Sequence, residues 1–275
     1  MKSVPSDGFG HNLLTDFLND KQARGLSPQT IRFYKVYLTR FLGSIYKPVL
    51  ELTKADISRF INALTCSPGG KHAYFRSIRA FYKWAQSESL ITDIPRMESP
   101  KVPKPLRIGV GLRDVKILLD AAQSSRDKSI VSLLADTGLR RSEACSIKWE
   151  DIDRENGTIR VWGKGAKQRV VRYGPITRCL LNEWRYESKA DVDRPLFGLK
   201  SSGLQDVLRR LEKRTGIRCN AHAFRRTFAT ESVRNGLNVF YVQSLLGHSS
   251  LTMTRIYAEQ VSSEDAIKAY KPIVT

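Results

Sequence analysis

The sequence has no apolar run approaching the ~18 residues that a membrane-spanning helix requires, and Met1–Gly10 lack the hydrophobic core of a secretory signal. Cysteine is scarce: Cys66, Cys145, Cys179 and Cys219 are scattered, and no two form a C-x-x-C pair. The first two absences exclude a transmembrane helix and a secretory signal. The third argues against a disulfide framework or a four-cysteine zinc site and predicts a reducing compartment, the cytoplasm.

Acidic residues are also few, since 27 Asp and Glu stand against 46 Lys and Arg, for a formal charge of +19. The excess is spread along the chain: residues 1–105 hold 16 basic and 8 acidic residues, and residues 106–275 hold 30 and 19. This predicts a folded protein that binds a polyanion, with DNA or RNA first among the candidates. The alternative is a basic protein whose surface is merely solvated. At 275 residues and 41% hydrophobic content, the chain can form one large or two ordinary domains.

Prolines cluster in one segment, Pro95–Arg107, which reads PRMESPKVPKPLR. Each proline removes a backbone donor and disfavours helix at the residue before it, so the segment is predicted to be extended and semi-rigid. We therefore predict an N-terminal helical domain over residues 1–98, a linker over 99–107, and a second domain over 108–275.

Apolar residues recur at helical spacing throughout the first domain. Four helices are predicted, beginning near His11 and at the N-cap signals Ser27-Pro28, Thr53 and Ser67-Pro68. The pattern predicts a small all-α domain.

The second domain is mixed. Gly157–Tyr173 contains two runs of strand-forming residues on either side of Gly163-Lys164-Gly165, which predicts a β-hairpin. Helical patterns occupy residues 112–123, 127–136, a short stretch after Arg141, 176–187, 202–215, 222–235, 239–246, 250–258 and 263–270. The predicted fold class is mainly α with a small β-sheet.

Five motifs place basic or nucleophilic side chains where they could do chemistry. They are TGLRRSE (137–143), GKGAK (163–167), HAFRR (222–226), LGH (246–248) and Tyr257. Each alone has an ordinary structural explanation: a surface ion pair for an arginine, a satisfied structural histidine, or a packed tyrosine. Cys219-x-x-His222 could be half of a zinc site, but no second matching pair lies nearby in the sequence.

Together these motifs closely resemble the catalytic boxes of the tyrosine recombinases, the family of phage integrases and Xer recombinases. The family's spacing is present: Arg140 to Lys164 is 24 residues, His222 to Arg225 is 3, Arg225 to His248 is 23, and His248 to Tyr257 is 9. The resemblance covers residues 112 to 260. It implies an N-terminal SAM-like core-binding domain and a C-terminal catalytic domain that together clamp DNA.

The resemblance also implies a role for each motif residue. Arg140 and Arg225 clamp the scissile phosphate, since guanidiniums stay charged and present paired donors. Lys164 resembles the general acid that protonates the leaving 5′ oxygen, and neighbouring positive charges favour a lowered pKa for it. Glu143 resembles the acid that supports the first arginine, although an ordinary helix ion pair explains it equally well.

Tyr257 resembles the nucleophile that forms a 3′-phosphotyrosyl bond. His222 resembles the residue that assists proton transfer at the tyrosine, and His248 the residue that donates a hydrogen bond to the phosphate. The bond energy is conserved in the covalent intermediate, so no cofactor and no metal are expected. Basic side chains expected to contact DNA are Lys71, Arg76, Arg79, Lys83, Arg141 and Arg226.

The function implied is a site-specific DNA recombinase acting in integration, excision or resolution, as for a mobile element. Its expected partners are double-stranded core sites, a homotetramer formed through exchange of segment 262–275, and accessory proteins, with no membrane. Docking of that segment on its own domain is the alternative. Two other functions stay open: relaxation of DNA in the manner of a type IB topoisomerase, and a catalytically silent DNA-binding regulator. A cytoplasmic, nucleoid-associated location is expected.

Overall fold

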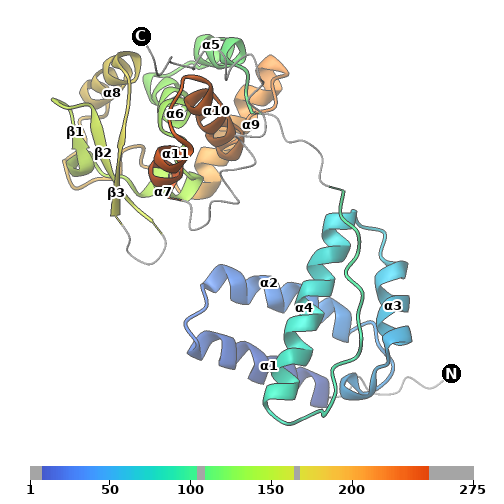
Figure 1. Ribbon diagram of the computed structural model, residues 1–275. Coiled ribbons are helices and arrows are strands. Elements are labelled where there is room, and N and C mark those ends of the chain that lie inside the picture. The colour runs from blue at the N-terminus through green and yellow to red at the C-terminus, as the bar shows by residue number, and fades with distance from the viewer. Residues whose placement is uncertain (1–7, 104–108, 164–167, 248–275) are drawn as a thin grey trace, which may run out of the picture. The chain divides into compact units, whose positions relative to one another are not determined.

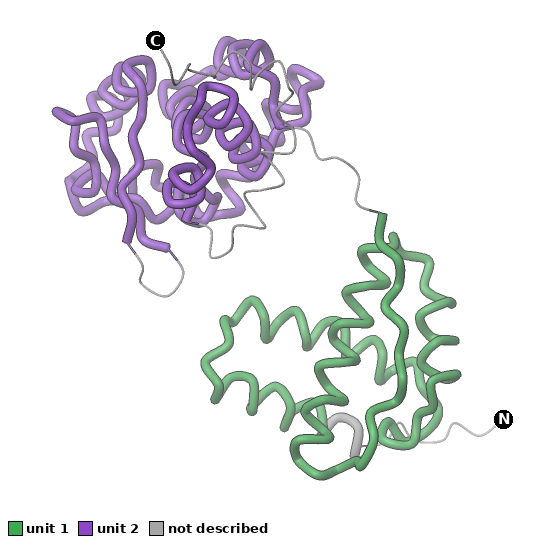
Figure 2. Tube along the Cα trace, in the orientation of Figure 1, with its two compact units in different colours: residues 1–105 green, residues 106–275 purple. Residues whose placement is uncertain are grey.

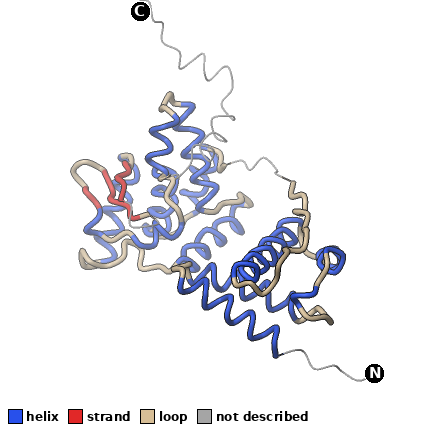
Figure 3. The backbone as a smooth tube through the Cα atoms, turned by 60° about the horizontal axis from the view of Figure 1, so that its bottom comes forward, coloured by secondary structure: helices blue, strands red, loops and turns tan. Residues whose placement is uncertain are grey.

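The computed structural model describes residues 8–103, 109–163 and 168–247. The chain divides into two compact units, residues 1–105 and 106–275 (Figure 2). Helix dominates both units, and the strands of the described residues form one small sheet in the second unit (Figure 3). The predicted fold class, mainly α with a small sheet, is confirmed.

The first unit contains the four predicted helices. They are α1 (Gly8–Ala23), α2 (Pro28–Leu42), α3 (Lys54–Ala63) and α4 (Pro68–Ser87), with a 3-10 turn at Val49–Glu51. Their starts follow from side-chain capping. Ser27 accepts a hydrogen bond from the Thr30 amide at 3.3 Å, and Thr53 forms a capping box with Asp56.

The core of the first unit is aromatic. In Figure 1, α1 and α2 run side by side and cross α4, and their inward faces bury Phe17, Phe41 and Phe81 completely. The rings of Phe17 and Phe81 meet edge to face with centroids 5.7 Å apart, a preferred aromatic geometry. The Tyr82 hydroxyl is also buried and donates to the Val49 carbonyl at 2.5 Å, so the 3-10 turn is tied to α4.

The start of the proline-rich segment belongs to this unit. Residues 95–103 have no regular secondary structure, and Ile94 and Met97 are partly buried against the unit's core. The described part of the segment is therefore extended along the first unit. The predicted domain limits at 98/99 and 107/108 stay predictions.

The second unit contains seven described helices, each near a predicted one. They are α5 (Leu112–Ala121), α6 (Ser125–Thr137), α7 (Arg141–Ser146), α8 (Pro175–Ser188), α9 (Ser201–Thr215), α10 (Ala221–Arg234) and α11 (Val239–Leu246). The helices predicted over 250–258 and 263–270, and the exchange segment 262–275, lie outside the described residues.

The sheet is antiparallel, in the order β1 (Ile152–Asp153), β2 (Thr158–Trp162) and β3 (Gln168–Arg172). The hairpin β2–β3 is the predicted one. The two-residue strand β1 was not predicted, because so short a strand shows no alternation. Ile159 pairs with Val171 and both are buried, so that pair marks the core-facing side of the sheet.

Helix α6 lies at the centre of the unit, in contact with α8 on one side and α10 on the other (Figure 1). It ends at Gly138, whose φ of +58° is the left-handed cap conformation that glycine adopts most readily. The chain then turns at once into α7. This turn places Arg140 at the start of α7 and leaves the Gly138 carbonyl facing α10.

We expect Gly138→Ala to lower the free energy of unfolding by about 2–4 kcal/mol, because it adds overpacking to backbone strain. A β-carbon at this position would lie 2.8 Å from Phe228 Cδ1 and 2.9 Å from Leu246 Cδ2. The matched control is Gly216→Ala, where φ is +72° and nothing lies within 4 Å. Backbone strain alone predicts a loss of about 1–2 kcal/mol there. Urea denaturation of the full chain measures both, and equal losses would contradict the packing account.

Candidate active site

Arg140 stands at the N-cap position of α7, and Glu143 lies one turn further along. The Glu143 carboxylate accepts from the Arg140 backbone amide at 2.8 Å through Oε2 and from Arg140 Nη1 at 2.8 Å through Oε1. The arginine side chain is 33% exposed, whereas that of Glu143 is 4% exposed. Glu143 therefore holds both the backbone and the guanidinium of Arg140 while leaving part of the guanidinium open to solvent.

Arg225 lies on α10 and is almost fully buried, at 3% exposure. Its Nη1 donates to the Gly138 carbonyl at 2.8 Å, and its Nη2 donates to the Leu246 carbonyl at 2.5 Å. Arg140 donates to the same Leu246 carbonyl at 3.3 Å and to the Gly247 carbonyl at 3.1 Å. Two arginines that are 85 positions apart in the sequence thus converge on the end of α11.

A third arginine, Arg169 of β3, completes the group. Its Nη1 and Nη2 donate to the two carboxylate oxygens of Glu143 at 3.0 and 2.8 Å, and its Nε donates to the Leu245 carbonyl at 2.7 Å. Burial raises the pKa of Glu143, but the hydrogen bonds from Arg169 and Arg140 and the charge of Arg169 outweigh it and bring that pKa to about 2. Glu143 is therefore ionised at neutral pH.

Arg169 was not among the site residues predicted from the sequence. The strand QRVVR does not reveal it, because Val170 and Val171 are both apolar and the alternation alone does not show which side is buried. The register pairs Arg169 with the buried Val161, so an arginine occupies a core-facing position of the hairpin. A charged residue there calls for a buried partner.

His222 lies three residues before Arg225 on α10 and is exposed at the surface. Its pKa is lowered, first by desolvation and then by the positive charges of Arg225, Arg226, Arg140 and Arg141. At a given pH near neutrality, a larger fraction of its imidazole is therefore neutral than in a free histidine. A neutral imidazole can accept a proton.

Three predicted catalytic residues lie outside the described residues: Lys164, His248 and Tyr257. Two of them adjoin described residues in the sequence. Lys164 follows Gly163, the first residue after β2, and His248 follows Gly247, whose carbonyl accepts from Arg140. In the described residues Arg140, Arg169 and Arg225 meet at the end of α11, Glu143 joins Arg140 to Arg169, and His222 lies three residues before Arg225 on α10.

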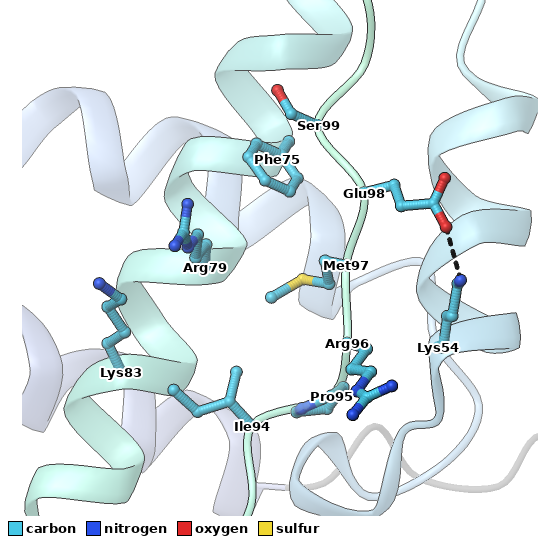
Figure 4. A pocket seen from close by; sticks show the side chains of 10 residues that line it. All are labelled: Lys54, Phe75, Arg79, Lys83, Ile94, Pro95, Arg96, Met97, Glu98 and Ser99. Carbon is cyan, nitrogen blue, oxygen red and sulfur yellow. Dashed lines mark hydrogen bonds and ion pairs between the residues drawn. The ribbon is translucent and has the colours of Figure 1, made fainter.

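Most of the predicted DNA-contacting residues lie on α4 of the first unit. Arg79 and Lys83 are exposed and line a pocket of about 640 Å³ together with Lys54 and Arg96 (Figure 4). Lys54 Nζ is 2.7 Å from the Glu98 carboxylate. The pocket thus carries four cations and one anion over an apolar wall. The sequence analysis missed Lys54 and Arg96, because they lie outside the face of α4.

The other predicted contacts are held in different ways. The Arg76 guanidinium stacks over the Phe33 ring at 5.7 Å, and Lys71 Nζ donates to the Asn62 carbonyl at 3.3 Å. In the second unit Arg141 donates to Gln205 Oε1 at 2.8 Å, and Arg226 is partly buried on α10. Arg76 lines a second hollow on α4 together with Arg79 and Lys83, whereas Arg141 and Arg226 belong to the second unit.

Other classes of site are missing from the part of the chain that the structure describes. Over residues 8–103, 109–163 and 168–247, no group of three or more His, Cys, Asp or Glu side chains is placed to hold a metal ion. Within the same residues, no helix combines the length and apolar character needed to cross a membrane.

Two family models match the chain. Residues 112–264 match the model described as the phage integrase family, and residues 13–92 match the phage integrase N-terminal SAM-like domain. The chain is 34% identical to tyrosine recombinase XerA of Saccharolobus solfataricus, over 94% of this chain and 91% of that protein.

Two solved structures are similar over most of their length. A crystal structure of XerA recombinase superposes with a TM-score of 0.53 at 28% identity, covering 94% of this chain and 97% of that one. The XerH site-specific recombinase bound to palindromic difH substrate, in a post-cleavage complex, superposes with a TM-score of 0.70 at 22% identity, covering 90% and 81%. The second likeness shows a common fold.

We expect Glu143→Gln to lower the free energy of unfolding at pH 7 by about 3–5 kcal/mol, because two arginines lose a buried counter-charge. The folded-state pKa of Glu143 is depressed to about 2. Its contribution is therefore full above the unfolded pKa of about 4.3 and is lost as pH falls toward 2. Urea denaturation at pH 7, 5 and 3 should show the gap between wild type and variant shrinking. The exposed Glu150→Gln serves as the control and should shift stability by under ~0.5 kcal/mol. A gap that stays constant with pH would contradict the assignment.

Proposed function

The chain belongs to the phage integrase family of tyrosine recombinases, and we propose that it is a site-specific DNA recombinase that cuts and rejoins strands through a 3′-phosphotyrosyl intermediate. The observation that supports this most directly is the convergence of Arg140 and Arg225 on the end of α11. Two fixed guanidiniums are suited to a scissile phosphodiester, whose negative charge increases as a nucleophile adds.

Each step of strand cleavage then has a proposed residue. Tyr257 attacks the phosphorus, and the bond from phosphorus to the 5′ oxygen breaks as Lys164 donates a proton to that oxygen. His222, whose pKa is lowered, accepts the tyrosine proton. Arg140, Arg225 and His248 hold the nonbridging oxygens of the phosphate; attack by a 5′-hydroxyl reverses the sequence and rejoins a strand.

The same proposal covers the partners. DNA core sites are bound by the α4 face with Arg79 and Lys83 and by the second unit with Arg141 and Arg226. We propose that four copies assemble on two sites through segment 262–275, with accessory proteins setting direction. The XerH structure that shares this fold holds its difH substrate, in keeping with such a DNA complex. Because the substrate is DNA, we propose a cytoplasmic, nucleoid-associated site of action.

We expect wild-type protein to form a covalent DNA adduct in EDTA and Tyr257→Phe to form none, because phenylalanine lacks the attacking oxygen. Genomic DNA fragments that the protein retains are identified first. Nicked duplexes of the same sequences are then prepared as probes, and strands covalently linked to the protein are detected on a denaturing gel. Tyr186→Phe, an exposed tyrosine on α8, is the matched control and should keep the adduct. If wild type binds DNA tightly but forms no adduct, the protein is a catalytically silent DNA-binding regulator. If it relaxes any supercoiled DNA, its activity is that of a type IB topoisomerase.

We expect the double substitution Arg79→Gln and Lys83→Gln to weaken binding of the retained duplex. The slope of log affinity against log salt should fall by about two, roughly one for each phosphate that the variant no longer neutralises. Arg59→Gln on α3 is the control, since Arg59 is 78% exposed but lies outside the pocket. Titrations between about 50 and 200 mM salt measure both slopes. An unchanged slope in the double variant would remove Arg79 and Lys83 from the DNA-binding surface.

A further inference from the structure

We propose that Arg169 is a positioning residue for strand cleavage, which fixes the Arg140 guanidinium and the end of α11 without touching the phosphate. The inference rests on the proposed function, since it concerns the same site. Arg169 lies on β3, donates to both carboxylate oxygens of Glu143 and donates to a carbonyl of α11.

The hairpin forces Arg169 inward. β2 and β3 are paired from Thr158–Arg172 to Trp162–Gln168, and in this register Arg169 faces Val161 on the buried side of the sheet. Its side chain is 11% exposed. On the same strand Arg172 faces the other way and is exposed. The sheet therefore buries one arginine of this strand, which is costly unless the charge is paired in the interior.

The bonds to Glu143 are bidentate, with each guanidinium nitrogen on a different carboxylate oxygen at 3.0 and 2.8 Å. Glu143 Oε1 is also the oxygen that holds Arg140 Nη1, and Oε2 holds the Arg140 amide. Arg169 thus fixes the plane of the carboxylate, and the carboxylate fixes Arg140. This two-step connection joins the hairpin to the start of α7.

The third bond joins Arg169 to α11. The last carbonyls of a helix have no partner within it and carry the negative end of the helix dipole. Here the carbonyls of Leu245, Leu246 and Gly247 accept from three guanidiniums: Arg169 takes the first, Arg225 and Arg140 share the second, and Arg140 takes the third.

Arg169 also lies directly against the last of these residues. A β-carbon on Gly247, where φ is +61°, would lie 3.2 Å from Arg169 Nη1. The next residue in the chain is His248, for which the proposed function gives a phosphate contact. A displacement of Arg169 would therefore move the Glu143 carboxylate, which holds Arg140, and would also move Gly247, the residue before His248.

A lysine cannot replace this arginine. Its ammonium is a point charge without the planar fork that matches a carboxylate, and it cannot reach both Glu143 oxygens and the Leu245 carbonyl in one geometry. Arg169→Lys keeps the charge and most of the side-chain volume but no longer fixes the Glu143 carboxylate and the end of α11. It is the gentler of two test variants; Arg169→Met removes the charge as well.

The test separates the rate of cleavage from the fraction of active protein. Excess wild-type or variant protein is mixed with the nicked duplex that wild type retains and cleaves, and covalent adduct is followed with time. A merely structural role lowers the final amount of adduct, whereas a positioning role lowers the rate constant. We expect the rate constant to fall roughly 10-fold for Arg169→Lys and roughly 100-fold for Arg169→Met, as for misplaced catalytic groups, with duplex affinity within about 2-fold of wild type.

Two further measurements sharpen the result. The charged groups that face Glu143 are Arg140 at the start of α7 and Arg169 on β3. Without Arg169 the Glu143 carboxylate is protonated at a higher pH. On acidification, the cleavage rate of Arg169→Met should therefore begin to fall at a higher pH than that of wild type. In a Glu143→Gln background, Arg169→Lys should cost less than it does in wild type, because both substitutions break the same connection.

Arg172→Lys, on the exposed face of the same strand, is the matched control and should leave the rate constant unchanged. Wild-type adduct with an unaltered rate constant in both Arg169 variants overturns this inference alone. So does an equal fall in Arg172→Lys, because the effect then belongs to the hairpin rather than to Arg169. A wild-type protein that forms no adduct overturns the proposed function, and this inference with it.

Discussion

One buried carboxylate, that of Glu143, holds together the described part of the catalytic unit. Arg140 and Arg169 approach it from two elements that are not adjacent in the sequence, and without its charge the two guanidiniums would repel each other in a region that water screens only in part. Its ionisation is secured by the same two arginines, which bring its pKa to about 2 despite burial. The start of α7 and the strand β3 therefore depend on one ionised group.

The end of α11 is the second half of this arrangement. Arg225 is almost fully buried, and a buried guanidinium must find acceptors for its donors. The Gly138 and Leu246 carbonyls supply two of them, and both belong to backbone at the end of a helix. Carbonyls at helix ends are free to accept. The positions of α6 and α11 are thus linked to the charge of Arg225 as well as to apolar packing.

Much of the fold could be predicted from the sequence because its signals are local. Ser27 and Thr53 are N-caps in the structure as their residue types indicate, and the glycine-flanked hairpin forms between β2 and β3. The contacts between segments that are distant in the sequence could not be predicted from local signals. The proximity of Arg140 and Arg225 followed from family resemblance, not from spacing. Arg169 was missed because its importance depends on register and on a partner 26 residues away, neither of which a single strand of five residues reveals.

The ionic network is better explained by geometry than by stability. Replacing a buried ion pair with apolar residues of similar volume is often neutral or stabilising, because two charges no longer have to be desolvated. An apolar core around α7, β3 and α11 could therefore be at least as stable as the one observed. It could not present guanidinium donors at a fixed place on the surface, since Arg140 is one-third exposed and needs an anchor beneath it. A site that binds a phosphate through rigid donors must hold its charges in advance. In the proposed function, Glu143 and Arg169 supply that constraint from a position that the phosphate does not reach.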